Sequence, residues 1–154
     1  MDEVLADLQE KIEAHGWAVR HVGAGPDGEP RAFSYTIGLT ALGHPELVVV
    51  GMPFESAQDF LNLAGELVRD GRRFRTGTTT ADLTDGARVA FVPVHDDSGL
   101  TAVEQVYGTV EALQLVWPDS AGRMPWDDDH ANPPSTQPLL GPLPDRWERD
   151  DASP

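Results

Sequence analysis

The short run Leu-Val-Val-Val at residues 47–50 places the strongest constraint on how this chain can fold. Three of its four residues are β-branched, and a proline and a glycine stand close to its two ends. Such a run is too short for a helix and is typical of a strand that is buried on both faces of a sheet. Residues 33–37 alternate between apolar and polar side chains, which predicts a half-buried strand just before it.

A polar loop, residues 40–46, joins these two predicted strands. His44 and Glu46 flank Pro45 where the buried strand begins, and proline restricts the backbone on both sides of itself. Rigid strands that present a polar loop are a common way to build a site. The sequence therefore predicts a site at this loop, without specifying its chemistry.

Charge and composition exclude several classes of function. The formal net charge is −15, which repels the phosphates of nucleic acid, and the cluster of four arginines at 69–75 is explained as a complement to a helix C-terminus. The chain has no cysteine, so disulfides and thiolate chemistry are absent. It has no apolar run that could span a bilayer and no basic region at its acidic N-terminus, so we expect a cytoplasmic protein that does not bind membranes.

Periodicity and turn signals predict an α+β fold. The predicted helices are 2–15, 53–70 and 101–107, and the predicted strands are 17–22, 31–38, 47–50, 87–94 and 110–117, with 72–75 as a candidate edge strand. Because hairpins dominate, we expect a mainly antiparallel sheet that curls toward a small barrel, covered by two main helices. A Gly-x-Gly-x-x-Gly pattern at 23–28 is interpreted as a hairpin turn, since no helix opens there to meet a pyrophosphate.

The composition changes near residue 127. Residues 1–126 are predicted to form one globular domain, and residues 127–154 an acidic, proline-rich tail that is dispensable for folding. Leu139, Leu140 and Trp147 are the apolar residues that could attach this tail to the domain.

Three motifs resemble a bacterial family known only as domain of unknown function 4262. They are Tyr-Thr-Ile-Gly-Leu at 35–39, Gly-His-Pro-Glu-Leu at 43–47, and Leu-Gln-Leu-Val-Trp-Pro-Asp at 113–119 followed by Gly-Arg-Met-Pro-Trp at 122–126. The resemblance covers roughly residues 10–128 and implies no established activity. The strand–loop–strand pattern is also similar to flavin-reductase-type split barrels, an analogy of pattern only.

Candidate catalytic residues come from the first two motifs. His44 and Glu46 could form an acid–base pair, with Tyr35 beside them, or supply two ligands of a carboxylate–histidine metal site. The alternative, which we favour, is that His44 and Glu46 satisfy backbone groups at the mouth of the sheet, because two such residues do not define a metal site without a third ligand.

Candidate cofactor-binding residues come from the first and the third motif. They are Thr36, Trp117, Asp119, Arg123 and Trp126, which we expect around one pocket between loops 40–46 and 117–126. Arg123 has two candidate roles, to bind the anionic group of a ligand or to clamp a carboxylate of Asp119 or Asp127. We favour the clamp.

Two functions of different class remain open from the sequence. The first is a protein that binds a small molecule or cofactor, with enzyme activity undecided and a flavin or divalent metal as weakly supported cofactors. The second is a non-enzymatic interaction module, of the inhibitor or immunity type, whose acidic surface binds a basic protein partner. The first predicts a concave pocket and the second a flat acidic face; we favour the first.

Overall fold

The structure is a computed structural model that describes residues 3–25, 32–83, 88–118, 123–127 and 137–149. These residues form helices α1 (Glu3–His15), α2 (Phe54–Arg69) and α3 (Thr101–Tyr107), the 3-10 helix η1 (Leu39–Leu42), and strands β1 (Ala18–Val22), β2 (Phe33–Ile37), β3 (Glu46–Val50), β4 (Thr78–Thr80), β5 (Val89–Pro93), β6 (Ala112–Val116) and β7 (Glu148–Arg149). No helix among the described residues is long and apolar enough to cross a membrane.

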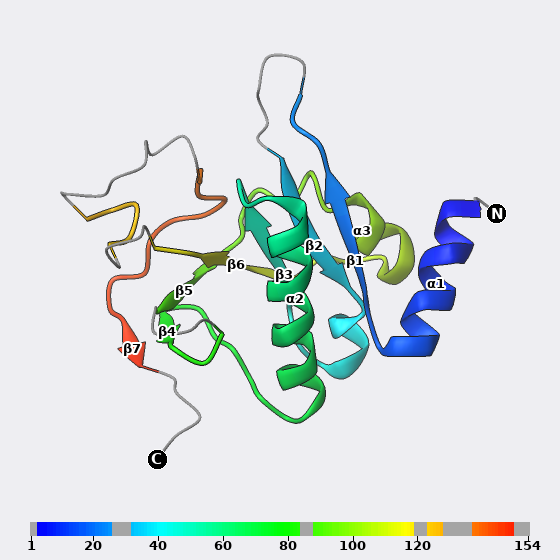
Figure 1. Cartoon of the computed structure of the whole chain (residues 1–154), viewed down its shortest axis with the longest axis horizontal. Coiled ribbons are helices and arrows are strands. Elements are labelled where there is room, and N and C mark those ends of the chain that lie inside the picture. Colours follow the sequence, from blue (N-terminus) through cyan, green and yellow to red (C-terminus); the bar gives the residue numbers. More distant parts are fainter. Residues whose placement is uncertain (1–2, 26–31, 84–87, 119–122, 128–136, 150–154) are drawn as a thin grey trace.

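The strands form one sheet in the order β1-β2-β3-β6-β5-β4-β7 (Figure 1). β3 pairs with β6 and β4 pairs with β7 in parallel, while the other neighbours are antiparallel. The α+β class is confirmed, but the mainly antiparallel, barrel-like sheet is wrong: the sheet is mixed and open, with β1 and β7 at its edges. β3 and β6 pair in parallel near the middle of the sheet, an arrangement that requires cover on both faces.

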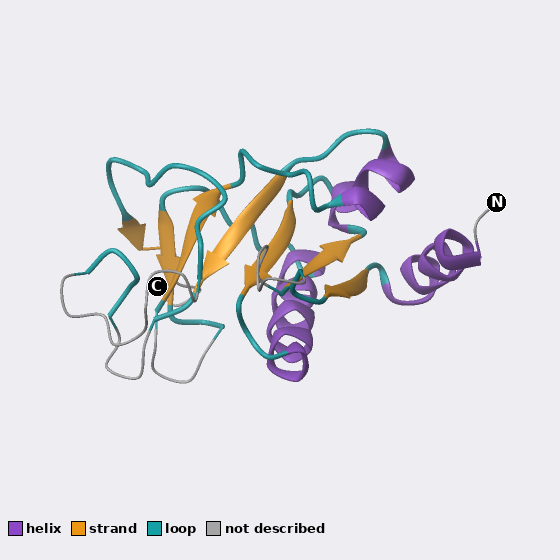
Figure 2. Cartoon of the chain, turned by 90° about the horizontal axis from the view of Figure 1, so that it is seen from above, coloured by secondary structure: helices purple, strands orange, loops and turns teal. Residues whose placement is uncertain are grey.

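Helices cover both faces of the sheet (Figure 2). On one face α2 packs against alternate residues of the central strands, including Leu47, Val49, Leu113 and Leu115. On the other face α1 and α3 pack against the intervening residues of β2 and β3, including Tyr35, Ile37, Val48 and Val50. All five residues of β3 are buried, which confirms the prediction of a strand covered on both sides.

Residues 137–149 lie against the half of the sheet formed by β5 and β6. The Gln137 amide donates to Trp117 O and accepts from Trp117 N, at 2.9 and 2.8 Å. The Gln114 amide donates to Pro138 O and accepts from Leu140 N, at 2.9 and 2.8 Å. Trp147 stacks on Trp126 with a centroid separation of 5.2 Å. Side chains thus join this segment to the sheet, while its dispensability for folding stays a prediction.

Two local expectations have clear outcomes. Residues 72–75 are not a strand: the Phe74 N–H donates to a histidine ring instead of a neighbouring strand, and the strand of this region is β4. β2 returns antiparallel to β1, so the pattern at 23–28 joins two strands of a hairpin and does not precede a helix. The part of that turn from residue 26 onward lies outside the described residues.

Candidate functional site

Glu46 is buried at the start of β3, with 0% of its surface exposed, and its carboxylate organises the loop before it. Its two oxygens accept five hydrogen bonds, from the hydroxyls of Thr36 and Thr40 and from the backbone N–H groups of Gly38, Leu39 and Thr40, at 2.6–3.1 Å. Burial raises the pKa of Glu46, and the hydrogen bonds oppose that rise. Both carboxylate oxygens accept hydrogen bonds from the loop, so Glu46 is the hydrogen-bond partner of the backbone where η1 begins.

Gly38 explains why the backbone can come so close to this carboxylate. Its φ is +139°, a conformation that favours glycine, and a Cβ there would lie 2.5 Å from Gly16 O. The loop is therefore fixed by glycine sterics on one side and by Glu46 on the other.

His44 joins the same loop to the segment that follows α2. Its Nδ1 lies 2.7 Å from Pro45 O, and its Nε2 lies 2.9 Å from Phe74 N. A backbone N–H can only donate, so Nε2 accepts and Nδ1 carries the proton. Burial lowers the pKa of His44, and the nearby Arg73 charge lowers it further. Both ring nitrogens are occupied by the protein, which leaves no nitrogen for a metal or a substrate.

Tyr35 and Thr36 are also built into the fold. Tyr35 is 0% exposed, and its hydroxyl accepts a 3.3 Å hydrogen bond from Ala102 N near the start of α3. Thr36 Oγ1 accepts from Leu47 N at 2.9 Å while it donates to Glu46. The alternative favoured for His44 and Glu46, that they satisfy backbone groups at the mouth of the sheet, agrees with the backbone contacts of those two side chains.

The expected pocket between loops 40–46 and 117–126 is wrong in its geometry. β3 and β6 are parallel, with Glu46 level with Ala112. Residues 40–46 therefore precede β3 at one end of the sheet, whereas Trp117 follows β6 at the other end and its indole nitrogen lies 3.4 Å from Val50 O. Five residues of strand span about 16 Å. An antiparallel pairing of β3 with β6 would have placed both loops at one end of the sheet.

The remaining predicted cofactor-binding residues are Trp126, Arg123 and Asp119. Trp126 stacks on Trp147 over β5 and β6. Arg123 is exposed. Asp119, one proposed partner of its clamp, lies outside the described residues. Asp127, the other, accepts a 2.8 Å hydrogen bond from Met124 N. The roles proposed for these residues in ligand binding stay predictions.

A Ser–His–amide relay lies between β1, β2 and α2, and the sequence analysis missed it. The His21 ring has Ser34 Oγ 2.7 Å from Nδ1 and Gln58 Oε1 2.9 Å from Nε2. A relay of this kind can activate a serine nucleophile. Ser34 is only 1% exposed, however, so a substrate cannot reach its hydroxyl, and we interpret the relay as a structural link between sheet and helix.

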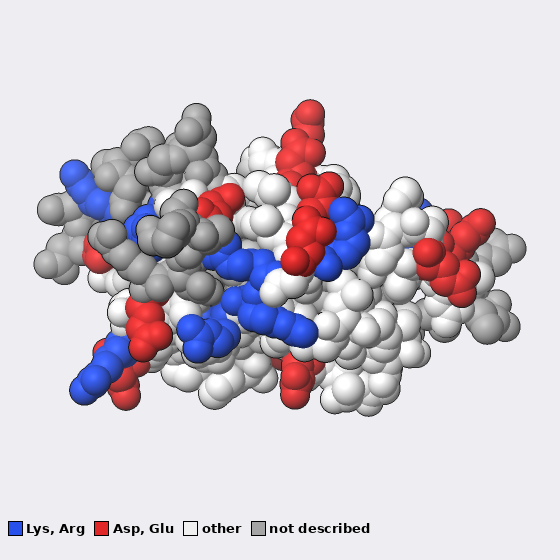
Figure 3. Space-filling model, turned by 90° about the horizontal axis from the view of Figure 1, so that it is seen from below, with Lys and Arg blue, Asp and Glu red and all other residues white. Residues whose placement is uncertain are grey.

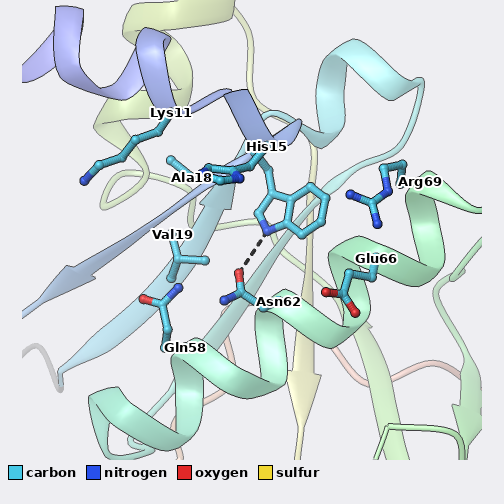
Figure 4. Close-up of a pocket in the computed structure, with 9 residues that line it drawn as sticks. Lys11, His15, Ala18, Val19, Gln58, Asn62, Glu66 and Arg69 are labelled. Atoms are coloured by element: carbon cyan, nitrogen blue, oxygen red, sulfur yellow. Dashed lines mark hydrogen bonds between the residues drawn. The ribbon is translucent and has the colours of Figure 1, made fainter. Parts of the chain in front are cut away.

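Beside this relay, α1, β1 and α2 enclose a cavity of about 430 Å³, which we call the α1–β1–α2 groove (Figure 4). Its lining residues are Lys11, His15, Trp17, Ala18, Val19, Gln58, Asn62, Glu66 and Arg69. The four contributed by α2 follow one another at spacings of four, four and three residues, which places them in a row along one side of the helix. From sequence alone such a polar row is read as a solvated face.

Trp17 forms the wall of the groove against α2. A Cβ at position 65 would lie 2.6 Å from its indole ring, so Gly65 is what lets the ring pack on the helix. The indole N–H donates to Asn62 Oδ1 at 3.1 Å, and the Arg69 guanidinium lies over the ring, 5.4 Å from its centroid. These contacts hold the wall in place and bring a cation to its edge.

The described residues contain no group of three or more His, Asp or Glu side chains that could hold a metal ion. The chemistry of the groove is therefore that of its hydrogen-bonding groups and charges. Two amides, two permanent cations, a histidine and one carboxylate surround the apolar side chains of Ala18 and Val19. Such a mixture suits non-covalent binding of a polar small molecule.

Comparison with known proteins gives a family and no activity. A family model described as Domain of unknown function (DUF4262) matches residues 11–131, a range that includes every lining residue of the groove. No curated protein and no solved structure matches the chain. The family match covers well over half of the sequence and confirms the resemblance seen in its motifs, so this chain belongs to the DUF4262 family.

Proposed function

We propose that this protein is a small-molecule-binding domain whose ligand occupies the α1–β1–α2 groove. The observation that carries the proposal is the cavity itself, about 430 Å³ between three elements whose mutual positions are set by packing and hydrogen bonds. Cavities of a few hundred cubic ångströms are of the size that small ligands use. The proposal assigns binding to the groove and no catalytic step.

The electrostatics near this groove differ from those of the chain as a whole. The chain carries a formal charge of −15. Lys and Arg side chains nevertheless gather on the underside of the molecule (Figure 3). Lys11 and Arg69 line the groove, whereas Arg72, which follows α2, is paired with Asp82 at 2.7 Å. Local cations of this kind attract an anionic small molecule despite the unfavourable net charge.

The alternative is an interaction module with an acidic docking face. Such a module requires a complementary surface and no cavity. The groove favours ligand binding over this alternative, because side chains of three separate elements converge on one hollow.

A groove-blocking variant tests the proposal. His15 is exposed at the end of α1 and lines the groove, so His15→Trp should fill it without disturbing the core. Glu13→Trp, at an exposed position of α1 outside the lining, is the matched control. We would measure thermal unfolding with a panel of carboxylic acids, amino acids, sugar phosphates, nucleosides and sugars at constant ionic strength.

We expect at least one class of compound to raise the unfolding temperature of the parent and of Glu13→Trp, but not of His15→Trp. A panel that shifts none of the three proteins would contradict the proposal. So would a response of His15→Trp equal to that of its control.

A further inference from the structure

The orientation of two amides in the α1–β1–α2 groove indicates what kind of ligand group it takes. An amide has a carbonyl oxygen that accepts hydrogen bonds and an amino group that donates two. Where the protein fixes the oxygen, the direction of the amino group is fixed as well. Asn62 and Gln58, one helical turn apart on α2, each have the oxygen in a hydrogen bond, and the donor-only indole of Trp17 fixes the orientation of Asn62.

Asn62 is fixed by Trp17. The indole N–H has no acceptor capacity, so its 3.1 Å partner on Asn62 must be the carbonyl oxygen. The Asn62 amino group therefore points away from the ring and into the groove. Figure 4 shows this nitrogen below the dashed hydrogen bond, on the side that faces Gln58.

Gln58 contacts His21, whose ring nitrogen can either donate or accept, and in the structure the oxygen of the amide faces the ring. Gln58 Oε1 lies 2.9 Å from His21 Nε2, and the other ring nitrogen lies 2.7 Å from Ser34 Oγ. With Nε2–H donating to Gln58 and Ser34 donating to Nδ1, each group of the relay has a partner. The Gln58 amino group is then turned toward Asn62 (Figure 4).

Neither amino group donates a hydrogen bond to any described residue. Gln58 and Asn62 are both half-buried, and their amino groups face the same space. These N–H donors therefore need an acceptor from outside the described chain. In the free protein water can supply that acceptor. An oxygen-rich ligand group would take the place of the water and bind both donors at once.

Lys11, on α1, also lines the groove, and its side chain extends away from Trp17, apart from the two amides (Figure 4). Its partner is Asp7, at 3.2 Å, with both side chains more than half exposed, and exposed pairs of this kind contribute little. Lys11 can therefore turn to a ligand at small cost. The carboxylate of the lining, Glu66, lies about 12 Å along the helix from Gln58 but only one turn, or about 6 Å, from Asn62, so a bound anion would lie toward Gln58 and away from Glu66.

We propose that the groove binds the oxyanion group of a small molecule, a carboxylate or a phosphate, between the amino groups of Gln58 and Asn62 with Lys11 as counter-charge. This inference rests on the proposed function and adds the chemical class of the ligand. Hydrogen bonds from amides to an anion are about twice as strong as those to a neutral oxygen. An anion therefore gains more from this donor set than a neutral ligand does.

Isosteric substitutions test the inference without removing the structural contacts. Asn62→Asp and Gln58→Glu keep the oxygen that Trp17 or His21 needs, but replace each amino group with a negatively charged oxygen. Gln105→Glu makes the same change of charge at an exposed position of α3 and is the matched control. Binding of acetate, succinate and inorganic phosphate would be measured by NMR titration at constant ionic strength, with chloride as the reference salt.

We expect at least one of these anions to bind the parent and Gln105→Glu with dissociation constants within twofold of each other. Asn62→Asp and Gln58→Glu should each weaken that binding at least tenfold. Tighter binding of acetate and succinate than of phosphate would identify a carboxylate ligand, and the reverse order a phosphate ligand. Either order supports the inference.

Three results would overturn it. Unchanged affinity in both isosteric variants would show that the amino groups do not bind the anion. Binding that Gln105→Glu weakens equally would show a general effect of charge. The third result is that the parent binds no anion, while neutral compounds still stabilise it and His15→Trp abolishes that stabilisation. The ligand class would then be wrong, but the proposed function would stand.

Discussion

The Glu46 loop and the α1–β1–α2 groove are both polar, but they use their polar atoms in opposite ways. Around Glu46 five donors converge on one carboxylate, and each has found its acceptor. In the groove the carbonyl oxygen of Asn62 is used, whereas its amino group has no hydrogen bond to the described chain. The capacity to bind something else lies where hydrogen-bonding groups are held in position and left unfilled.

The Glu46 loop coincides with a sequence motif because its conformation depends on several particular residues. A buried carboxylate, a glycine at φ +139° and a buried histidine must all be present for the loop to close. The groove needs no unusual residue, since ordinary polar side chains of α2 form it once β1 and α1 are packed beside them. A motif can therefore identify a structural constraint as readily as a binding site.

The largest effect on stability should come from removing the carboxylate of Glu46, the acceptor in the Glu46 loop. Glu46→Ala leaves three backbone N–H groups and two hydroxyls without their partner, and we expect a loss of about 3 kcal/mol or more in the free energy of unfolding. Urea denaturation would measure it. Glu13→Ala, at an exposed position of α1, should change stability by no more than about 0.5 kcal/mol. An equal, small effect of both changes would show that Glu46 does not hold the loop.

A somewhat smaller effect is expected from deleting residues 137–154. The contacts of Gln137, Leu140 and Trp147 with the sheet favour a loss of about 2–4 kcal/mol, from several hydrogen bonds and one aromatic stack. A chain that ends at residue 149 keeps these contacts and serves as the control. Equal denaturation midpoints for the two truncated chains would support the composition-based expectation that the tail is dispensable.

Much of the fold was predictable because its signals are local. The alternation in residues 33–37, the apolar run 47–50 and the apolar stripe of 53–70 each depend on residues that are close in sequence, and each element formed within a few residues of its predicted bounds. The parallel pairing of β3 with β6 was missed because strand direction depends on how the chain between them crosses the sheet. No residue within either strand encodes that direction.

The site was less predictable for the same reason. Trp17 and Asn62 are 45 residues apart, and their hydrogen bond determines which way the amide faces. Gln58 and His21 are 37 residues apart. The spacing of Gln58, Asn62, Glu66 and Arg69 on α2 was visible in the sequence, but only the packed positions of α1 and β1 turn that polar row into one side of a cavity.

His44 should make stability depend on pH by a smaller amount. Its folded pKa is lowered below 6.5, so the unfolded chain binds the proton more readily. The stability that neutral His44 provides is complete above pH 6.5 and is lost as the pH falls through the folded pKa, with a slope of at most about 1.4 kcal/mol per pH unit. Glu46, whose pKa is raised, acts with the opposite sign above pH 4.5.

Comparison of variants isolates the histidine. His44→Gln should remove the loss of stability between pH 6.5 and pH 5 that the parent shows in urea denaturation. His95→Gln changes an exposed ring and should keep the pH dependence of the parent. If His44→Gln and the parent have the same pH dependence, Phe74 N does not depend on a neutral ring.

The smallest effect separates the two halves of a single side chain, Asn62. Asn62→Leu removes the oxygen that accepts from Trp17 and leaves a buried indole N–H without a partner, which should cost about 1–2 kcal/mol in urea denaturation. Asn62→Asp keeps that oxygen and replaces the amino group with a charged oxygen one turn from Glu66, so its cost without ligand should stay within about 0.5 kcal/mol. This result would show that the Asn62 oxygen stabilises the fold, whereas the amino group does not and is available to a ligand in the groove. Equal losses in the two variants would mean that the amino group also stabilises the folded chain, and the contrast between a filled and an unfilled region would no longer hold at this residue.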